Sequence, residues 1–280
     1  MVEESLSKKI LSLSWPILVT QLLNMLYNLA DAFWIGNMEG AASVAAIQIS
    51  WPVFGVIIAV GFGFSAAAVA LISQYSGAAM DDRASYAASQ IIGVMLLLSL
   101  CFALLGFFST PFLISLLGAE EAVTERAIEY ISIIFLGLPF IFLTMSCDGI
   151  FRGRSRMVLS MSIMGASVII NIILDPLFIG GYSFIPAMGI SGAAIATVIS
   201  YIPPTFISLW VLSSGRIGVR IKSREMKPDL AETKKIVRIG LPAIIGHGGS
   251  AIGFFLMMYI VAMVPESTIA LAGYGIGDRL

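Results

Sequence analysis

The segment Y-A-A-S-Q-I-I-G-V-M-L-L-L-S-L-C-F-A-L-L-G-F-F, from Tyr86 to Phe108, contains no charged residue and is apolar along nearly all of its length. A helix needs about 20 predominantly apolar residues to cross the hydrocarbon core of a bilayer. The chain holds six further runs of comparable length and apolarity: Ile10–Met38, Val44–Ser73, Ala127–Phe151, Met157–Ile179, Ile190–Val211 and Ile236–Val264. The sequence therefore predicts seven membrane-spanning helices, because a helix satisfies its own backbone polar groups in lipid.

The overall composition agrees with this class of protein. Hydrophobic residues make up 58% of the chain and charged residues only 12%, whereas charged residues make up about a quarter of a soluble domain. A soluble protein is therefore excluded.

The basic residues are distributed unevenly between the two sides of the predicted bundle. If the amino terminus is cytoplasmic, all of the 16 Lys and Arg except Arg126 and Arg279 fall in the inner segments 1–9, 74–85, 152–156 and 212–238. The outer segments Gly36–Gly40 and Leu117–Glu125 carry only acidic charges. The positive-inside rule then predicts a multi-pass protein of the cell (inner or plasma) membrane, with a cytoplasmic amino terminus.

A short repeat suggests how the helices are organised. K-K-I-L-S-L-S-W-P at Lys8–Pro16 is echoed by K-K-I-V-R-I-G-L-P at Lys234–Pro242. Six spans separate the two copies, so both have the same orientation, as in transporters with parallel repeats. We expect a six-helix amino-terminal lobe at 1–213, a basic cytoplasmic linker at 214–233, and the start of a second lobe at 234–280 with helix seven and the beginning of helix eight. A fragment, a truncated version or a split gene would each explain this ending.

Two aspartates lie inside predicted spans. Asp31 is in Y-N-L-A-D-A-F-W and Asp175 is in N-I-I-L-D-P-L-F. A carboxylate near the middle of a bilayer costs about 2.5 to 3.5 kcal/mol on insertion scales, and such residues usually face a bundle interior. Asp31 and Asp175 are therefore predicted to form an ion or proton site.

Polar neighbours extend both positions along their helices. Gln21, Asn24, Asn28 and Asp31 recur at spacings of three and four, and Tyr27 precedes Asp31 by four, so all lie on one broad helix face. The alternative role for the amides is to join helices through interhelical hydrogen bonds.

The second aspartate has its own set of oxygen ligands. Asn171 lies four residues before Asp175, and Pro176 frees a backbone carbonyl one turn earlier. Thr197 could add a hydroxyl from the sixth helix, or could bond back to its own helix. Carboxylate, amide, carbonyl and hydroxyl oxygens suit sodium or a proton relay, so we expect Asp31, Asn171, Asp175 and Thr197 to form a proton site or a sodium site.

Three further features have competing interpretations. Asp148 lies one turn before Arg152, and a local ion pair is favoured over a role in the cation path. His247 could shuttle protons, but a packing role among glycines is favoured. Met157, Met161 and Met164 form a helical stripe that is either an adaptable face for apolar substrates or ordinary packing; we include Met161 and Met164 among the residues near a substrate cleft.

The sequence contains no P-loop, no H-E-x-x-H and no G-x-S-x-G. We therefore expect no enzyme, no cofactor and no nucleic-acid partner. A single His and two Cys are too few for a zinc site of the usual kind. The basic linker is expected to attract anionic membrane lipids.

Taken together, the motifs resemble those of the multidrug and toxic compound extrusion (MATE) family, especially its prokaryotic branch with acids in the amino-terminal lobe. The resemblance rests on L-S-W-P ending at Pro16, Y-N-L-A-D from Tyr27, D-G-I-F-R-G-R from Asp148, N-I-I-L-D-P from Asn171 and G-A-A-I-A-T from Gly192. It implies twelve helices in two six-helix lobes around a central cleft. It also implies efflux of small organic, often cationic, compounds by alternating access, in exchange for protons or sodium.

The resemblance also assigns roles to individual residues. It places Asp31, Asn171, Asp175 and Thr197 in the family's amino-lobe cation site, with Tyr27 beside it. Asp148 departs from the family pattern, in which Asn is usual before G-I-x-R-G. Most of the second lobe is missing, so the partner of this chain could be a separate second-lobe polypeptide.

Three other functions remain as alternatives. A flippase for lipid-linked precursors would keep the fold, but its anionic cargo would favour cationic residues in the cleft. A seven-helix receptor would fit the helix count; its retinal-binding version needs a lysine in helix seven, and none lies between Arg238 and Val264. The third alternative is a non-transporting membrane subunit.

Overall fold

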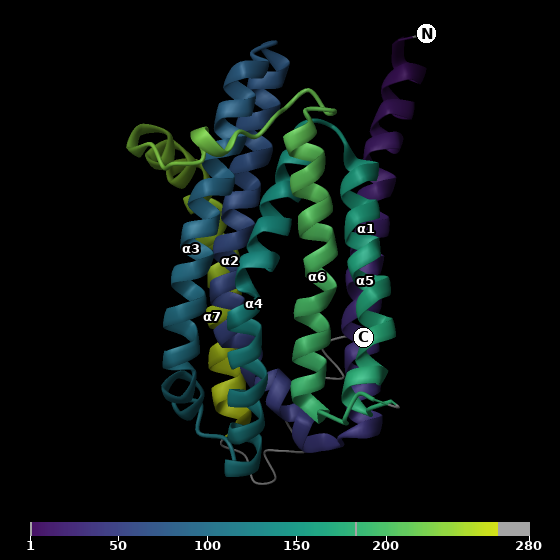
Figure 1. Cartoon of the computed structure of the whole chain (residues 1–280), viewed down its shortest axis with the longest axis vertical. Helices are drawn as coiled ribbons and strands as arrows, with labels where there is room; N and C mark the ends of the chain where they lie inside the picture. Colours follow the sequence, from purple (N-terminus) through teal and green to yellow (C-terminus); the bar gives the residue numbers. More distant parts are fainter. Residues whose placement is uncertain (1, 183, 263–280) are drawn as a thin grey trace.

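The structure is a computed structural model that describes residues 2–182 and 184–262 of the chain. Within these residues the fold is all-helical and has no β-strand (Figure 1). The elements are α1 (Val2–Met38), α2 (Ala41–Gly77), α3 (Asp81–Ser115), α4 (Glu121–Gly153), α5 (Met157–Ile179), α6 (Gly189–Ser214), the short 3-10 helix η1 (Ser223–Glu225) and α7 (Leu230–Ala262).

The predicted spans correspond to these helices. The five helices α2 to α6 are long and apolar enough to cross a membrane. α1 and α7 are 37 and 33 residues long, and α1 carries the predicted polar face. Most helices extend beyond the apolar runs: α3 begins at Asp81, where acidic residues favour the positive end of the helix dipole. The predicted beginning of helix eight falls in residues 263–280, outside the described residues.

The helices run side by side along the long axis of the molecule (Figure 1). α2 packs against α4 and α7, and α3 packs against α4. On the other side, α5 packs against α1 and α6, while α4 also contacts α6. α4 therefore joins the two groups of helices. The polar face predicted for α1 lies on the side of this helix that meets the space between the two groups.

Close helix approach depends on small residues at the crossings. A Cβ added to Gly149 on α4 would lie 2.5 Å from the backbone oxygen of Ser65 and 2.9 Å from the Cβ of Ala68, both on α2. Where α2 crosses α7, a Cβ on Gly240 would lie 2.7 Å from the carbonyl oxygen of Gly63. Glycine at these positions lets the backbones touch, as in other membrane bundles.

The segment between α6 and α7 is held against α3. The side chain of Gln90 donates hydrogen bonds to the carbonyl oxygens of Glu225 (2.6 Å) and Lys227 (2.8 Å), and accepts one from the backbone N–H of Asp229 (2.8 Å). The hydroxyls of Ser85 and Ser89 accept hydrogen bonds from two further linker amides. Side chains of α3 therefore fix the start of α7 by hydrogen bonds to the linker backbone.

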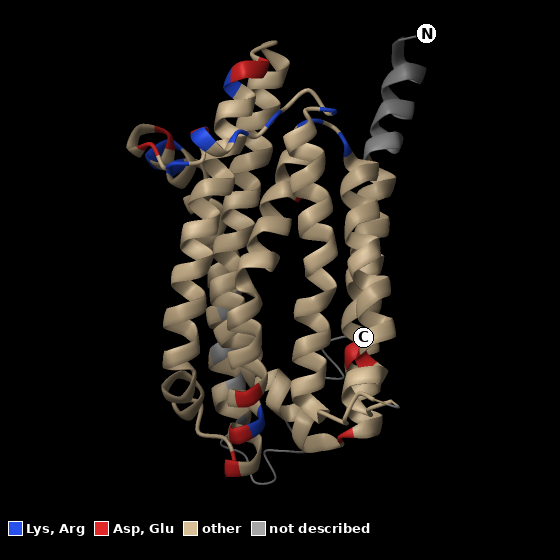
Figure 2. Cartoon of the chain, viewed as in Figure 1, with Lys and Arg blue, Asp and Glu red and all other residues tan. Residues whose placement is uncertain are grey.

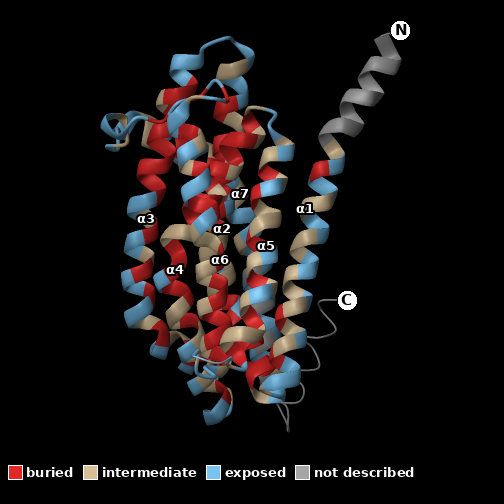
Figure 3. Cartoon of the chain, turned by 45° about the vertical axis from the view of Figure 1, so that its right-hand side comes forward, coloured by how far each residue is buried: buried red, intermediate tan, exposed pale blue. Residues whose placement is uncertain are grey.

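Charge is concentrated at the ends of the bundle (Figure 2). Lys and Arg gather at the end where the amino terminus lies, on the linker and the neighbouring helix ends. At the opposite end, Arg126 pairs with Glu39 at 3.2 Å. Figure 3 shows buried residues in the interior and α1 along one edge. The outer face of α1 exposes large apolar side chains, including Leu18, Leu22, Leu26 and Phe33, as expected for a surface covered by lipid.

Candidate functional site

A cavity of about 440 Å³ lies within the bundle, between α1, α2, α4, α5 and α6. One part of its wall is apolar and aromatic, formed by Trp51, Phe54, Phe62, Tyr130, Phe151 and Tyr201. The volume and mixed lining are typical of pockets for small organic molecules.

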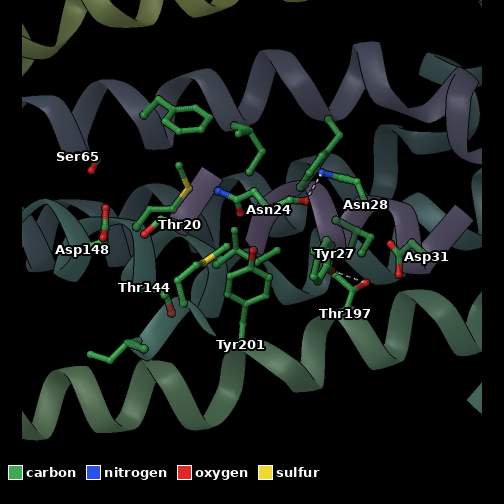
Figure 4. Close-up of a pocket in the computed structure, with 18 of the residues that line it drawn as sticks. Thr20, Asn24, Tyr27, Asn28, Asp31, Ser65, Thr144, Asp148, Thr197 and Tyr201 are labelled. Atoms are coloured by element: carbon green, nitrogen blue, oxygen red, sulfur yellow. Dashed lines mark hydrogen bonds between the residues drawn. The ribbon is translucent and has the colours of Figure 1, made fainter. Parts of the chain in front are cut away.

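The polar face of α1 supplies much of the remaining wall. Gln21, Asn24, Tyr27, Asn28 and Asp31 all line the cavity, as the spacing of three and four predicts, and Thr20 joins them. Figure 4 labels all of these except Gln21. The amide of Asn28 donates to the carbonyl oxygen of Asn24 (2.9 Å), and the amide of Asn24 donates to Oε1 of Gln21 (3.4 Å). These two bonds lie within α1 and do not join it to another helix, so both amides remain along the cavity wall.

Asp31 and Asp175 come together at one end of the cavity, across the interface of α1 and α5. Asp31 lines the cavity and is 6% exposed, whereas Asp175 lies behind it and is fully buried. The two carboxyl groups lie close enough for their charges to interact. Two ionised carboxylates this close repel each other in a poorly solvated interior, which favours a proton or another cation between them.

Asn171 completes this buried group. Its amide nitrogen donates a 3.0 Å hydrogen bond to Oδ1 of Asp175. Oδ2 of Asp175 and Oδ1 of Asn171 are both buried and meet no hydrogen-bond donor among the described residues. Two acceptor oxygens without a donor are therefore available to a cation at this place. Around this pair, and throughout the described chain, no three His, Cys, Asp or Glu side chains gather into a metal site.

The side chain of Thr197, on α6, forms a hydrogen bond with a residue of α1. The phenol of Tyr27 donates a 3.0 Å hydrogen bond to Oγ1 of Thr197 (Figure 4). This contact favours the interhelical role of Thr197 over a bond back to α6. It places the hydroxyl beside the α1 face that carries Asp31.

Asp148 and Arg152 lie at the other end of the cavity, where both belong to its lining. Oδ2 of Asp148 is 3.1 Å from Nε of Arg152, which confirms the predicted local ion pair. Ser160 on α5 donates a hydrogen bond to Oδ1 of Asp148, and Nη2 of Arg152 donates to Oγ of Ser65 on α2 (3.3 Å). Side chains from two other helices, α2 and α5, therefore hold the pair in place.

Two other predicted positions have distinct environments. Met164 lines the cavity, but Met161 does not. The α5 residues in the lining are Ser160 and, one turn later, Ile163 and Met164. His247 on α7 stacks on Phe62 with ring centroids 4.6 Å apart, which agrees with a packing role.

The sequence interpretation missed the aromatic wall. Trp51, Phe54, Tyr130 and Tyr201 lie on helices whose other apolar side chains face lipid or the core, so their residue type alone does not distinguish them. Tyr201 had one usable signal, because it lies one turn after Thr197 on the same helix face.

Comparisons with known proteins agree with this geometry. The MatE family profile matches residues 16–177, more than half of the chain. The chain is 29% identical to "Multidrug export protein MepA" of Staphylococcus aureus (strain bovine RF122 / ET3-1), over 98% of this chain and 59% of that protein. It therefore spans about three-fifths of the length of this relative.

Solved structures of transporters share the fold. A structure described as the inward-facing conformation of a multidrug resistance MATE family transporter of the MOP superfamily has a TM-score of 0.82 and 28% identity, covering 91% of this chain and 57% of that chain. An outward-facing one has a TM-score of 0.80 and 30% identity, covering 89% and 54%. The chain is therefore a multi-pass membrane protein that belongs to the MatE family of MATE transporters.

Proposed function

We propose that the chain forms part of a secondary transporter that expels small organic, often cationic, compounds in exchange for protons or sodium. Helices α1 to α6 form one lobe, and α7 begins the second. The observation that carries the proposal is the contact between Asp31 and Asp175 at the end of a cavity of small-molecule size. The family and the multidrug export protein that resembles the chain support the same class of cargo.

The acid pair is the coupling site. With both carboxylates ionised, their repulsion in a poorly solvated interior is strong. A proton or a sodium ion between them removes this repulsion, and the oxygens of Asn171 and Thr197 supply further ligands. Hard oxygen donors of this kind suit either ion. Their titration is coupled, so the pair and not one residue takes up the ion.

The cavity is the cargo site. Its aromatic walls offer flat, apolar and electron-rich surfaces, which favour planar organic cations through stacking and cation–π contacts. The amides and hydroxyls along α1 supply hydrogen bonds for orientation. Cargo and coupling ion thus share Asp31, which lines the cavity and contacts Asp175.

Movement of α1 links the two events. Pro16 removes one backbone hydrogen bond from α1, and the hydroxyl of Thr20 donates to the Pro16 carbonyl at 2.8 Å; both features favour bending. Entry of the ion lets α1 bend near Pro16 and narrows the cargo-binding face. Outward release of the cargo follows, in a cycle of alternating access that accords with the inward-facing and outward-facing structures of similar proteins.

The charge distribution supports a cytoplasmic amino terminus in the plasma membrane. Lys and Arg gather at the end of the bundle that holds the amino terminus (Figure 2), and basic residues stay on the cytoplasmic side. Cargo with a net negative charge is disfavoured. Among the described residues that line the cavity, the positively charged side chain is that of Arg152, and it is already paired with Asp148.

Asp31→Asn tests the proposal. Cells that produce the longest reading frame encoding this chain are loaded with a cationic dye, and efflux is followed after a proton or sodium gradient is imposed. Asp31→Asn is expected to abolish gradient-driven efflux at unchanged protein level. Asp82→Asn, at the exposed start of α3, is the matched control and should retain efflux. Gradient-driven efflux by Asp31→Asn at the wild-type rate would refute the assignment.

A further inference from the structure

The cavity has a second charged end, opposite Asp31. Figure 4 shows Asp148 and Ser65 at one end of the pocket and Asp31 with Thr197 at the other. Asp148 and Arg152 both belong to the lining there, although neither is needed for the coupling site.

The pair is open to the cavity even though it is held by its neighbours. The side chains of Arg152 and Asp148 are 35% and 32% exposed. Asp148 contacts the Arg152 Nε, and Ser65 contacts the Arg152 Nη2. A guanidinium has five N–H donors, so its remaining edge can still bind a second acceptor.

Stability alone is a poor reason for such a pair. An ion pair one turn apart on a helix contributes little to stability when it is exposed to water. Partial removal of both charged groups from water costs more free energy than this attraction returns. Replacement of such an ion pair by two hydrophobic residues of similar size often leaves a protein as stable or makes it more stable. Phe62, Phe151 and Met164 belong to the lining of the same cavity. A ligand that binds both charges would offset this cost.

The arrangement selects the ligand by its charge pattern. A lone cation is attracted by Asp148 and repelled by Arg152, and a lone anion meets the reverse. A molecule that carries a cation and a carboxylate side by side can place each group against its opposite charge. Arg152 can hold the carboxylate through two parallel N–H bonds, while the neighbouring aromatic rings hold a flat body.

We propose that Asp148 and Arg152 form a dipolar subsite for aromatic zwitterions, which gives the transporter a preference for compounds with both a cation and a carboxylate. The proposal rests on the assignment of the cavity as the cargo site. It assigns to these two residues a selection that the Asp31 end, with its acidic groups, does not by itself provide.

Two dyes that differ at one group test this proposal. Rhodamine 19 has a free carboxylate, and rhodamine 6G is its ethyl ester with the same cationic ring system. Their affinities for the purified chain in detergent are measured by fluorescence polarisation. For the wild type we expect the free acid to bind about tenfold more tightly, which corresponds to about 1.4 kcal/mol. Equal affinity, or a preference for the ester, would overturn the proposal without the need for any variant.

Variants of the two charges should move this ratio in opposite directions. Arg152→Gln removes the partner of the carboxylate and should shift preference about tenfold toward the ester. Asp148→Asn leaves Arg152 unpaired and should shift it toward the free acid. Arg152→Lys keeps the charge and should retain part of the wild-type ratio. Asp81→Asn removes an ion pair of the same type, with Arg154 at 2.8 Å, outside the cavity lining, and should leave the ratio unchanged.

Failure of the two proposals can be told apart. Asp31→Asn should abolish ion-driven efflux, whereas Arg152→Gln should change the acid-to-ester ratio of binding. A ratio that is the same in wild type, Arg152→Gln and Asp148→Asn would contradict the dipolar subsite while leaving the coupling site intact. Efflux by Asp31→Asn would contradict the coupling site and leave the measured ratio as evidence for the subsite.

Discussion

The phenol of Tyr27 on α1 donates a 3.0 Å hydrogen bond to the hydroxyl of Thr197 on α6, at the end of the cavity that holds Asp31 (Figure 4). This bond connects α1, which packs mainly against α5, to the helix on the other side of α5. A helix that moves during transport needs contacts of this kind that can be broken at low cost, and interhelical hydrogen bonds in membranes contribute about 0.6 kcal/mol on average.

A double-mutant cycle measures this bond. Tyr27→Phe and Thr197→Val should each lower the free energy of unfolding by about 0.6 kcal/mol, because each removes one partner of the same bond. The double variant should lose no more than the larger single loss. Unfolding by SDS titration gives these values. Strictly additive losses would show that the two hydroxyls do not interact.

The contact between the linker and α3 predicts a second effect. Gln90→Leu removes the partners of three linker backbone groups. A buried polar group without a partner costs about 1 to 3 kcal/mol, so we expect a lower unfolding temperature and faster trypsin cleavage after Lys222 and Arg224. The exposed Gln74→Leu at the end of α2 is the control with the same chemical change. Equal protease resistance of wild type and Gln90→Leu would argue against the linker contact.

The crossing of α2 and α7 predicts a third effect. Gly240→Ala would place a methyl group 2.7 Å from the Gly63 carbonyl oxygen, so the two helices must move apart. We expect a clear loss of thermal stability in detergent. Gly246→Ala on the same helix meets nothing within 4 Å and should be neutral or stabilise the helix by up to about 1 kcal/mol. The reverse order of stabilities would place α7 elsewhere.

Sequence patterns predict the helices well because lipid imposes one dominant requirement, a continuous apolar run. Met157–Ile179 agrees with α5 at both ends. The ends of other helices are less well predicted: Tyr86–Phe108 becomes Asp81–Ser115, because helices continue through polar turns outside the apolar region and hydropathy does not report those turns.

The chemistry of the site is predictable where a residue is costly in a membrane. Asp31 and Asp175 stand out for that reason, and the structure brings them together. The side chains that shape the cavity are less visible in the sequence, because Trp51 or Tyr130 is equally acceptable against lipid, in a core or on a cavity wall. The position of Met161 outside the lining has the same cause, since a methionine stripe does not indicate which face meets the cavity.

The central claim is that Asp31 and Asp175 share one exchangeable cation. Infrared difference spectroscopy of the purified chain, recorded as pH and sodium concentration are changed, observes the carbonyl stretch of a protonated carboxyl group directly. We predict one such band in the wild type that disappears when the proton leaves at high pH or is displaced by sodium. This band should be altered or absent in both Asp31→Asn and Asp175→Asn. A band that persists unchanged in both variants, or no band at any pH, would contradict the shared site.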